Sequence, residues 1–155
     1  STISAVLRDA LAMDVVEMDQ VIAERERMSI SDIFEKHGEL YFRDLETKLL
    51  VELQEKTNTV VSCGGGVAMR ECNVTEMKKN GKVVLLTAKP ETILERVENN
   101  HDRPLLENNK TVAYIAELME KRREKYEAAA DMIIETDGKS AQKICEEMIQ
   151  RLGEQ

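Results

Sequence analysis

Aromatic side chains are scarce in this chain of 155 residues, which has no tryptophan, two phenylalanines and three tyrosines. A hydrophobic core with so few rings must be built from Leu, Ile, Val, Met and Ala. Long apolar runs are absent too, and none approaches the roughly 20 residues that a membrane-spanning helix requires. We therefore expect an aliphatic core and no membrane partner.

Cysteine is also rare, and its three positions show no short spacing. Cys63, Cys72 and Cys145 form an odd number, contain no C-x-x-C pair and have no pair of histidines near them. This pattern disfavours a disulfide framework and a zinc site, and it predicts three reduced thiols that are mostly buried. The first residues lack the basic and then apolar layout of a signal peptide, so the cytoplasm is the expected location.

The residues that are abundant indicate a single globular domain over residues 1–155. Hydrophobic residues make up 42% of the chain and charged residues 34%, a composition typical of folded proteins with one core. The net charge of −8 argues against a nucleic-acid partner, which is usually met by a basic face. An anionic ligand would have to be held by arginines gathered at one place.

Short β-branched runs alternate with longer helical patterns, which predicts a parallel sheet with helices on its faces. The predicted strands are Val15–Met18, Thr59–Ser62, Lys82–Leu86 and Met132–Glu135. Helix ends are marked by Ser29 and Ser140 as caps, Gly38 as a terminator and Pro90 as a first residue. The expected fold class is α/β, in three layers.

Ser1-Thr2, followed directly by an amphipathic helical pattern, is typical of the end of a phosphate-binding loop. Such a P-loop is G-x-x-x-x-G-K-[S/T] between a strand and a helix, and its glycines and lysine are missing here. Gly138-Lys139-Ser140 does not replace it, because Ile133 stands where the first glycine is needed. We expect that the central first strand and most of the loop are absent from this chain; the alternative is a complete protein that begins at Ser1.

Acidic residues and a glycine run follow two of the predicted strands. Glu17 and Asp19 alternate, so an extended strand would place both on one face, at the edge where α/β sheets bind ligands. One could support a hydrated Mg²⁺ and the other could meet a substrate hydroxyl; alternatively, Asp19 caps the next helix. Gly64-Gly65-Gly66 suits the close approach of an anion to backbone N–H groups, or else forms a tight turn.

A long polar segment, residues 99–112, is predicted to be a lid over a site. It contains Arg103, which precedes a proline. Arg43, which follows two aromatic residues, and Arg122, within a predicted long helix, are further candidates for binding an anion. Each of these arginines alone is most often a solvated surface charge.

Taken together, the motifs resemble the shikimate kinase family, a group of small P-loop kinases similar to nucleoside monophosphate kinases. The resemblance rests on Ser1-Thr2, Glu17-Met18-Asp19, Ser29–Phe34, Gly38-Glu39-x-Tyr41-Phe42-Arg43-x-Leu45-Glu46, Gly64-Gly65-Gly66, Arg103-Pro104-Leu105-Leu106 and Arg122-x-x-x-Tyr126. It extends over essentially the whole chain in the same order. It implies a monomer that transfers the γ-phosphoryl group of ATP to the 3-hydroxyl of shikimate, in aromatic amino-acid biosynthesis.

The resemblance also implies roles for individual residues. Asp19 and Arg103 correspond to catalytic residues: the first orients the substrate hydroxyl or accepts its proton, and the second reaches the transferring phosphate. The residues that correspond to substrate-binding positions are Asp19, Arg43, Gly65, Gly66 and Arg122, and residues 20–56 correspond to the shikimate-binding subdomain. The residues that correspond to ATP-binding positions are Ser1, Thr2, Arg96 and Arg103. Mg²⁺ would meet Ser1 directly and Glu17 through water, with Ser62 near its water shell.

Two departures from the family pattern matter. Glu17 stands where the family commonly has Asp, which lengthens the reach to the metal. The phosphate-cradling loop is not in the sequence, so we expect the chain as it stands to be inactive. The alternatives are a protein that binds shikimate or a related hydroxy acid without catalysis, and a kinase with another acceptor such as gluconate. The paired arginines and the glycine run favour a ring-bearing carboxylate.

Overall fold

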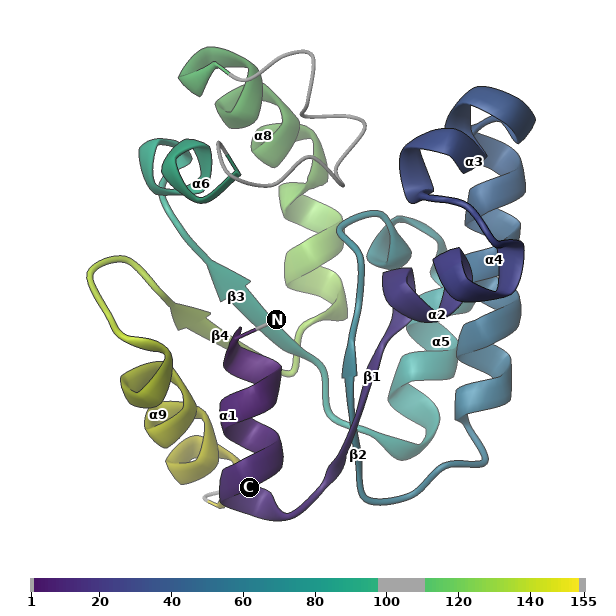
Figure 1. The fold of residues 1–155 in the computed structure, drawn as a ribbon. Helices are drawn as coiled ribbons and strands as arrows, with labels where there is room; N and C mark the ends of the chain where they lie inside the picture. Colours follow the sequence, from purple (N-terminus) through teal and green to yellow (C-terminus); the bar gives the residue numbers. More distant parts are fainter. Residues whose placement is uncertain (1, 98–110, 154–155) are drawn as a thin grey trace.

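The computed structural model of the protein describes residues 2–97 and 111–153, in which helices and strands alternate (Figure 1). The elements are α1 (Thr2–Leu11), β1 (Asp14–Glu17), α2 (Met18–Glu26), α3 (Ile30–His37), α4 (Glu39–Leu53), β2 (Thr59–Ser62), the short 3₁₀ helix η1 (Val67–Met69), α5 (Glu71–Asn80), β3 (Val84–Thr87), α6 (Pro90–Val97), α8 (Val112–Ala129), β4 (Met132–Glu135) and α9 (Ala141–Gly153). This order confirms the predicted α/β class.

All four predicted strands occur, and they form two parallel pairs. In the first pair β1 lies beside β2 with Glu17 opposite Ser62, and in the second β3 lies beside β4 with Thr87 opposite Glu135. Among the described residues, no hydrogen-bonded ladder joins β2 to β3. The strands therefore form two two-stranded halves rather than one continuous sheet of four.

Two predicted strands differ from the observed ones at both ends: β1 is Asp14–Glu17 rather than Val15–Met18, and β3 is Val84–Thr87 rather than Lys82–Leu86. The first strand ends at Glu17, because Met18 begins α2 and is fully buried there. The third strand begins at Val84 rather than Lys82, because the backbone of Val83 bonds to Asp131. The amide of Val83 donates to Asp131 Oδ2 at 2.7 Å, and the Asp131 amide donates to the Val83 carbonyl at 2.8 Å.

Two hydrophobic clusters fill the two halves. One is formed by α2, α3, α4 and η1 and includes Met18, Ile33 and Phe42. The other is formed by α1, β4 and α9 and includes Leu7 and Ile134. Phe42 is the only aromatic side chain among the buried core residues of the described chain, which confirms the predicted aliphatic core.

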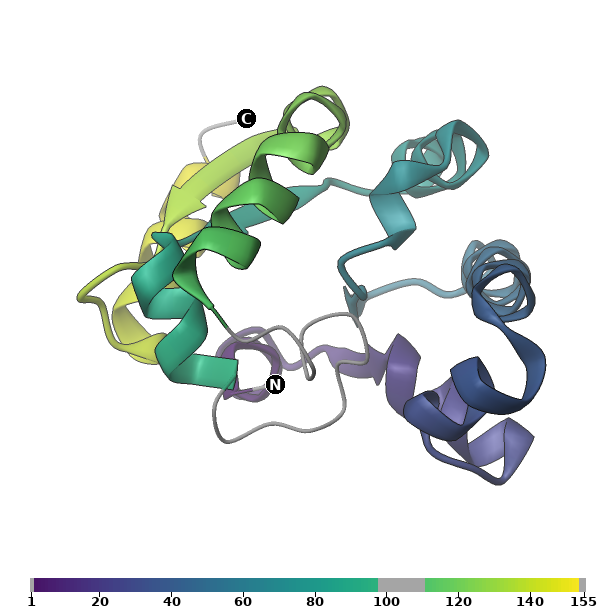
Figure 2. The ribbon, with the colours of Figure 1, turned by 90° about the horizontal axis from the view of Figure 1, so that it is seen from above.

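Helix α1 connects the two halves. Its residue Leu7 belongs to a cluster against which Val60 of β2 and Val84 of β3 both pack. Seen from above, α2, α3 and α4 lie on one side of the molecule and α6 and α8 on the other, with α1 between them (Figure 2). Side chains from both halves can therefore contribute to one site.

The predicted helix ends are confirmed. Ser29 Oγ accepts a hydrogen bond from the Asp32 amide at 3.1 Å at the start of α3, and Ser140 caps α9 in the same way. Gly38 ends α3 with a φ of 87°, a left-handed value that favours glycine. Pro90 is the first residue of α6.

The structure tests two expectations drawn from composition. Within the described ranges, no helix combines the length and the apolar character needed to cross a membrane. The prediction of mostly buried thiols holds only in part: Cys145 is a buried residue, whereas Cys63 and Cys72 are exposed residues, although the thiol of Cys63 itself is shielded from solvent. Cys63 follows the end of β2 and Cys72 lies in the first turn of α5, and sequence alone does not reveal which side of such elements faces solvent.

Candidate functional site

Neighbouring parallel strands bring the first candidate residues to one edge. Because β1 and β2 run in the same direction with Glu17 opposite Ser62, the residues that follow them, Asp19 and Gly64, emerge side by side. The predicted alternation of Glu17 and Asp19 along one strand is wrong, because β1 ends at Glu17. Asp19 lies in the first turn of α2, where the helix dipole favours a negative charge. It does not cap that helix, since Glu17 occupies the cap position.

The glycine run is surrounded by the predicted site residues. A methyl group on Gly64 would lie 3.1 Å from Asp19 Oδ1, and one on Gly65 would lie 2.9 Å from Arg122 Nη1. A methyl group on Gly66 would fall within the guanidinium group of Arg43. The structure thus brings together all five residues that were predicted to bind substrate.

The need for glycine in this run comes from space and not from backbone conformation. Gly38 and Gly138 have positive φ angles, whereas the three consecutive glycines do not. Gly66, for example, has φ −89° and ψ −8°, which any residue adopts. The run does form a tight turn, in which the Val67 amide donates to the Gly64 carbonyl at 3.2 Å, but the backbone angles of this turn do not require glycine.

Arg43 is held by carboxylates on its own helix, α4. Its Nη1 lies 2.8 Å from Glu46 Oε1, and its Nη2 lies 3.2 Å from Glu39 Oε2. The guanidinium also lies over the ring of Phe42, with 5.3 Å between Cζ and the ring centroid. Burial lowers the pKa of Arg43, but the hydrogen bonds and charges of Glu46 and Glu39 outweigh it and raise the pKa overall. Arg43 therefore remains a fixed cation.

Glu46 is a site residue for which the sequence alone predicts no role. Its side chain is 1% exposed. Burial raises its pKa, the hydrogen bond and charge of Arg43 lower it, and the negative charge of Asp19 raises it again, so the net shift is upward. Its second oxygen, Oε2, would lie 3.1 Å from a methyl group on Gly64 and has no hydrogen-bond partner among the described residues. The signal for Glu46 was its i,i+3 spacing from Arg43.

Arg122 approaches the glycine run from α8 and, unlike Arg43, is not paired with a carboxylate of the described residues. Its Nη1 lies 3.2 Å from the hydroxyl of Tyr126, one turn later, and that hydroxyl donates to the Gly65 carbonyl at 2.6 Å. Among the described residues, no ion pair neutralises Arg122. Its positive charge thus remains available to an anion. The sequence likewise predicts no role for Tyr126, although its i,i+4 spacing from Arg122 indicates that the two side chains share one face of the helix.

Glu17 lies where the two strand ends meet. Burial raises its pKa, but hydrogen bonds, including those from Ser62 and Ser4, outweigh this and lower the pKa overall. An ionised carboxylate beside a hydroxyl is a donor set that suits hydrated Mg²⁺. The described residues contain no cluster of three or more side chains that could by themselves hold a metal ion.

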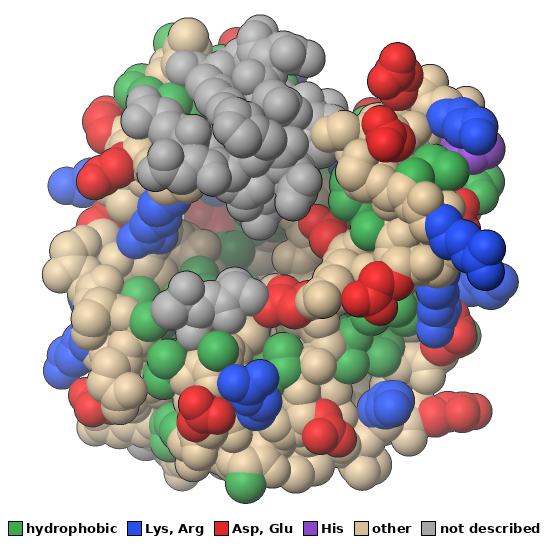
Figure 3. Space-filling view, in the orientation of Figure 1, with side chains coloured by type: hydrophobic (Ala, Val, Ile, Leu, Met, Phe, Trp, Pro, Cys, Tyr) green, Lys and Arg blue, Asp and Glu red, His purple; other side chains and the backbone are tan. Residues whose placement is uncertain are grey.

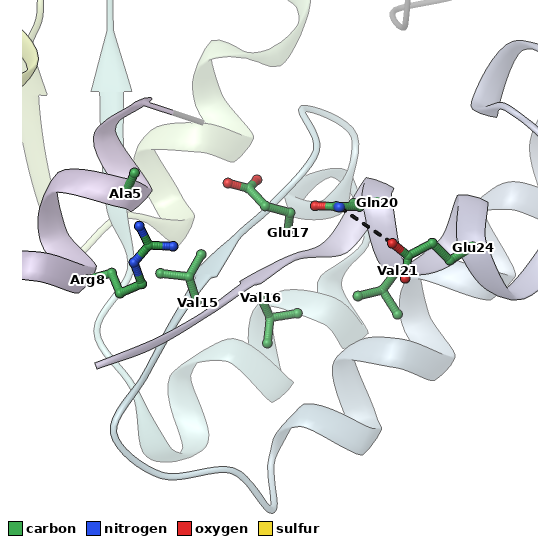
Figure 4. A pocket seen from close by; sticks show the side chains of 8 residues that line it. All are labelled: Ala5, Arg8, Val15, Val16, Glu17, Gln20, Val21 and Glu24. Atoms are coloured by element: carbon green, nitrogen blue, oxygen red, sulfur yellow. Dashed lines mark hydrogen bonds between the residues drawn. The ribbon is translucent and has the colours of Figure 1, made fainter. Parts of the chain in front are cut away.

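A shallow hollow of about 400 Å³ lies beside Glu17, between α1, β1 and α2. Figure 4 shows its lining, in which Gln20 Nε2 donates to Glu24 Oε1 at 3.4 Å. The space-filling view shows a hollow between the two halves, with acidic side chains at its rim (Figure 3). The glycine run lies at the end of β2, on the same edge as Glu17.

Arg96, predicted to contact the nucleotide, lies in the other half. It is on α6, and its Nη1 donates to Thr136 Oγ1 at 3.0 Å, immediately after β4. Ser1, the Thr2 side chain, Arg103 and residues 99–110 of the predicted lid lie outside the described residues.

Comparisons with known proteins agree on one family. The family model described as shikimate kinase matches residues 1–153. The shikimate kinase of Persephonella marina is 41% identical over 152 residues, which cover 98% of this chain and 91% of that protein. A solved shikimate kinase from Acinetobacter baumannii, in complex with shikimate, has a TM-score of 0.93 at 29% identity, covering 99% of this chain and 86% of that one. The solved enzyme from Aquifex aeolicus has a TM-score of 0.83 at 35% identity, covering 99% and 89%.

Proposed function

The chain belongs to the shikimate kinase family, and we propose that the residues around its glycine run bind shikimate and act on the hydroxyl that is phosphorylated. The activity is ATP-dependent phosphorylation of shikimate. Phosphoryl transfer demands little covalent chemistry from protein groups, so positioning and charge neutralisation carry most of the catalysis.

The shikimate carboxylate binds between Arg122 and Arg43. The observation that carries this proposal is the convergence of both guanidiniums on the adjacent residues Gly65 and Gly66, where no side chain intervenes. Arg122, whose charge no described carboxylate balances, supplies the larger share of the attraction. Arg43, already paired with Glu46, supplies directional N–H groups.

The 3-hydroxyl of shikimate faces Asp19. Oδ1 of Asp19 lies against Gly64, at the strand edge that carries the rest of the site. An ionised carboxylate there orients the hydroxyl and accepts its proton as the oxygen attacks the γ-phosphate.

ATP supplies the phosphoryl group, and Mg²⁺ neutralises the negative charge of the phosphates. Glu17 and Ser62 are placed to hold water molecules of the metal. Arg96 borders the nucleotide beside the loop that follows β4. Ser1, Thr2 and Arg103 complete the phosphate side in this proposal. The protein acts as a cytoplasmic monomer, without nucleic acid or membrane.

Steady-state kinetics of the full-length protein with ATP, Mg²⁺ and shikimate test the hydroxyl assignment. Asp19→Asn should lower kcat by about 10²–10⁴-fold, the usual contribution of a general base, while the KM for shikimate changes little. Asp32→Asn is the matched control, because Asp32 also lies in the first turn of a helix but away from the glycine run. Equal losses in kcat and in shikimate affinity would contradict the assignment of Asp19 as the proton acceptor. Gluconate, as an alternative acceptor, should not be phosphorylated.

Arg122→Ala tests the carboxylate site. It should weaken shikimate binding by about thirtyfold or more, as expected for removing one partner of a buried ion pair. Arg123→Ala is the control, since the neighbouring arginine is exposed and paired with Glu120. An unchanged Kd for shikimate in Arg122→Ala would contradict the assignment.

A further inference from the structure

The glycine run has no side chains of its own, so bonds to the backbone around it must hold it in place. Asn73, in the first turn of α5, makes one of these bonds: its Nδ2 donates to the carbonyl of Val67 at 2.9 Å. The amide of Val67 in turn donates to the Gly64 carbonyl at 3.2 Å. Asn73 therefore fixes the position of Val67, the residue that follows the glycine run and bonds back to its first glycine.

The same amide group reaches helix α4. Asn73 Oδ1 accepts a hydrogen bond from Thr47 Oγ1 at 2.8 Å. Thr47 lies one helical turn after Arg43 and directly after Glu46. A single side chain thus links the helix that carries the substrate-facing arginine to the loop against which that arginine lies.

Both members of this pair have defined orientations. Asn73 is 1% exposed, and burial of an amide is costly unless both its ends find partners, which here are Val67 and Thr47. The Thr47 oxygen also accepts from Arg70 Nη1 at 3.2 Å, and Arg70 is paired with Asp44 at 2.9 Å. The single hydrogen of the Thr47 hydroxyl has two acceptors within reach, Asn73 Oδ1 at 2.8 Å and the Arg43 carbonyl at 3.2 Å, and the shorter distance favours Asn73.

We propose that Asn73 and Thr47 are positioning residues that set the spacing between the glycine run and Arg43, and so determine how tightly shikimate is bound. This inference rests on the proposed function of the same site. Gly66 and the guanidinium of Arg43 are so close that no methyl group fits between them, so small changes in spacing alter the carboxylate site. Arg96, the residue predicted to contact the nucleotide, is held by Thr136 in the other half. ATP binding should therefore not change when the contact between Asn73 and Thr47 is lost.

Two substitutions at one position test the pair in the full-length protein. Thr47→Val keeps the shape but removes the hydroxyl and with it the bonds to Asn73 and Arg70, and it should raise the KM for shikimate about five- to tenfold. Thr47→Ser keeps the hydroxyl and should restore the parent value. The KM for ATP should stay within about twofold in both variants.

Thr75→Val is the matched control. Thr75 also bonds the carbonyl four residues earlier on its helix, as Thr47 does, but it makes no side-chain bond to another element among the described residues. Its kinetic constants should match those of the parent. A rise of both KM values in Thr47→Val, or of neither, would overturn the proposal, and so would failure of Thr47→Ser to restore binding.

Amide hydrogen exchange separates this proposal from the assignment of the substrate. Thr47→Val should speed exchange at Gly64–Val67 relative to Thr75→Val, whatever acid the site binds. Faster exchange without any phosphorylation of shikimate would defeat the proposed function and leave the pairing intact. Unchanged exchange would defeat the positioning role by itself.

Discussion

At the scale of single residues, the site depends on side chains that are absent as much as on those present. The three consecutive glycines adopt backbone angles open to any residue. They are needed because a methyl group on Gly66 would overlap the Arg43 guanidinium, and methyl groups on Gly64 and Gly65 would crowd Asp19 and Arg122. An acceptor molecule can therefore reach backbone N–H groups and charged side chains at the same time.

Gly66→Ala tests this interpretation. The added methyl group would displace the Arg43 guanidinium, which is the end of a flexible side chain, so binding should suffer more than folding. We expect shikimate affinity to fall about tenfold or more, the equivalent of about 1.4 kcal/mol. The variant should keep most of its free energy of unfolding. Gly153→Ala is the control, because a methyl group there meets open space. Isothermal titration calorimetry measures the shikimate affinity of both variants. Unaltered affinity in Gly66→Ala would count against a binding role for Arg43.

Cys63 reports on the negative charge of the site. Burial of the thiol, followed by the charges of Glu46 and Asp19, raises the pKa of Cys63 to about 11. Only the thiolate reacts with iodoacetamide, so about one Cys63 in a thousand is reactive at pH 8. Alkylation should be slow at neutral pH and accelerate as the pH rises toward 11.

Asp19→Asn should lower the pKa of Cys63 by removing one of the charges that raise it, and so speed its alkylation at pH 8. Mass spectrometry follows the rate, and Cys72, also in an exposed residue, serves as the internal reference. If Cys63 reacts as fast as Cys72 in the parent, or if Asp19→Asn has no effect, the charge cluster is not as described.

At the scale of elements, two helices each face the glycine run with a pair of residues about one helical turn apart. On α4, Arg43 and Glu46 face it at positions i and i+3, and on α8, Arg122 and Tyr126 face it at i and i+4. Residues at these spacings share one face of a helix. Each helix thus presents a cation together with a second group that orients it.

Tyr126→Phe tests the α8 contact. It removes the hydroxyl that donates to Gly65 and accepts from Arg122, and each such bond contributes about 1 kcal/mol. We expect the KM for shikimate to rise several-fold, with a smaller change in kcat. Tyr114→Phe, on the same helix, provides the control. Equal behaviour of the two variants in steady-state assays would show that the Tyr126 hydroxyl does not position the site.

At the scale of the whole molecule, the site depends on how the two halves are joined. Its glycine run and Arg43 belong to the half that contains β1 and β2, whereas Arg96 belongs to the half with β3 and β4. Helix α1 packs against both through the cluster that includes Leu7. The relative placement of acceptor and nucleotide residues therefore rests on apolar contacts of α1.

Leu7→Ala should destabilise the protein by about 2–5 kcal/mol, the usual cost of a cavity at a buried leucine. Urea unfolding measures the loss. Leu40→Ala is the control, because Leu40 is 69% exposed and its removal should cost less than about 0.5 kcal/mol. A loss below about 1 kcal/mol for Leu7→Ala would show that α1 does not hold the halves together.

The sequence by itself determined the α/β class, the four strands and the helix caps, whereas the acceptor-site residues were predicted from the resemblance to a family. The class, the strands and the caps follow from local patterns: β-branched runs and capping residues such as Ser29. The aliphatic core was also predictable, because the aromatic residues that could have built another are missing.

Only the tertiary structure decided the rest. Asp19 lies in a helix and not on a strand, Cys63 and Cys72 are in exposed residues, and the glycines are required by space. Each of these depends on contacts between residues far apart in the chain, such as Tyr126 with Gly65, which are 61 positions apart. A periodic pattern reports which face of an element is apolar, but what that face meets is known only once the elements are packed.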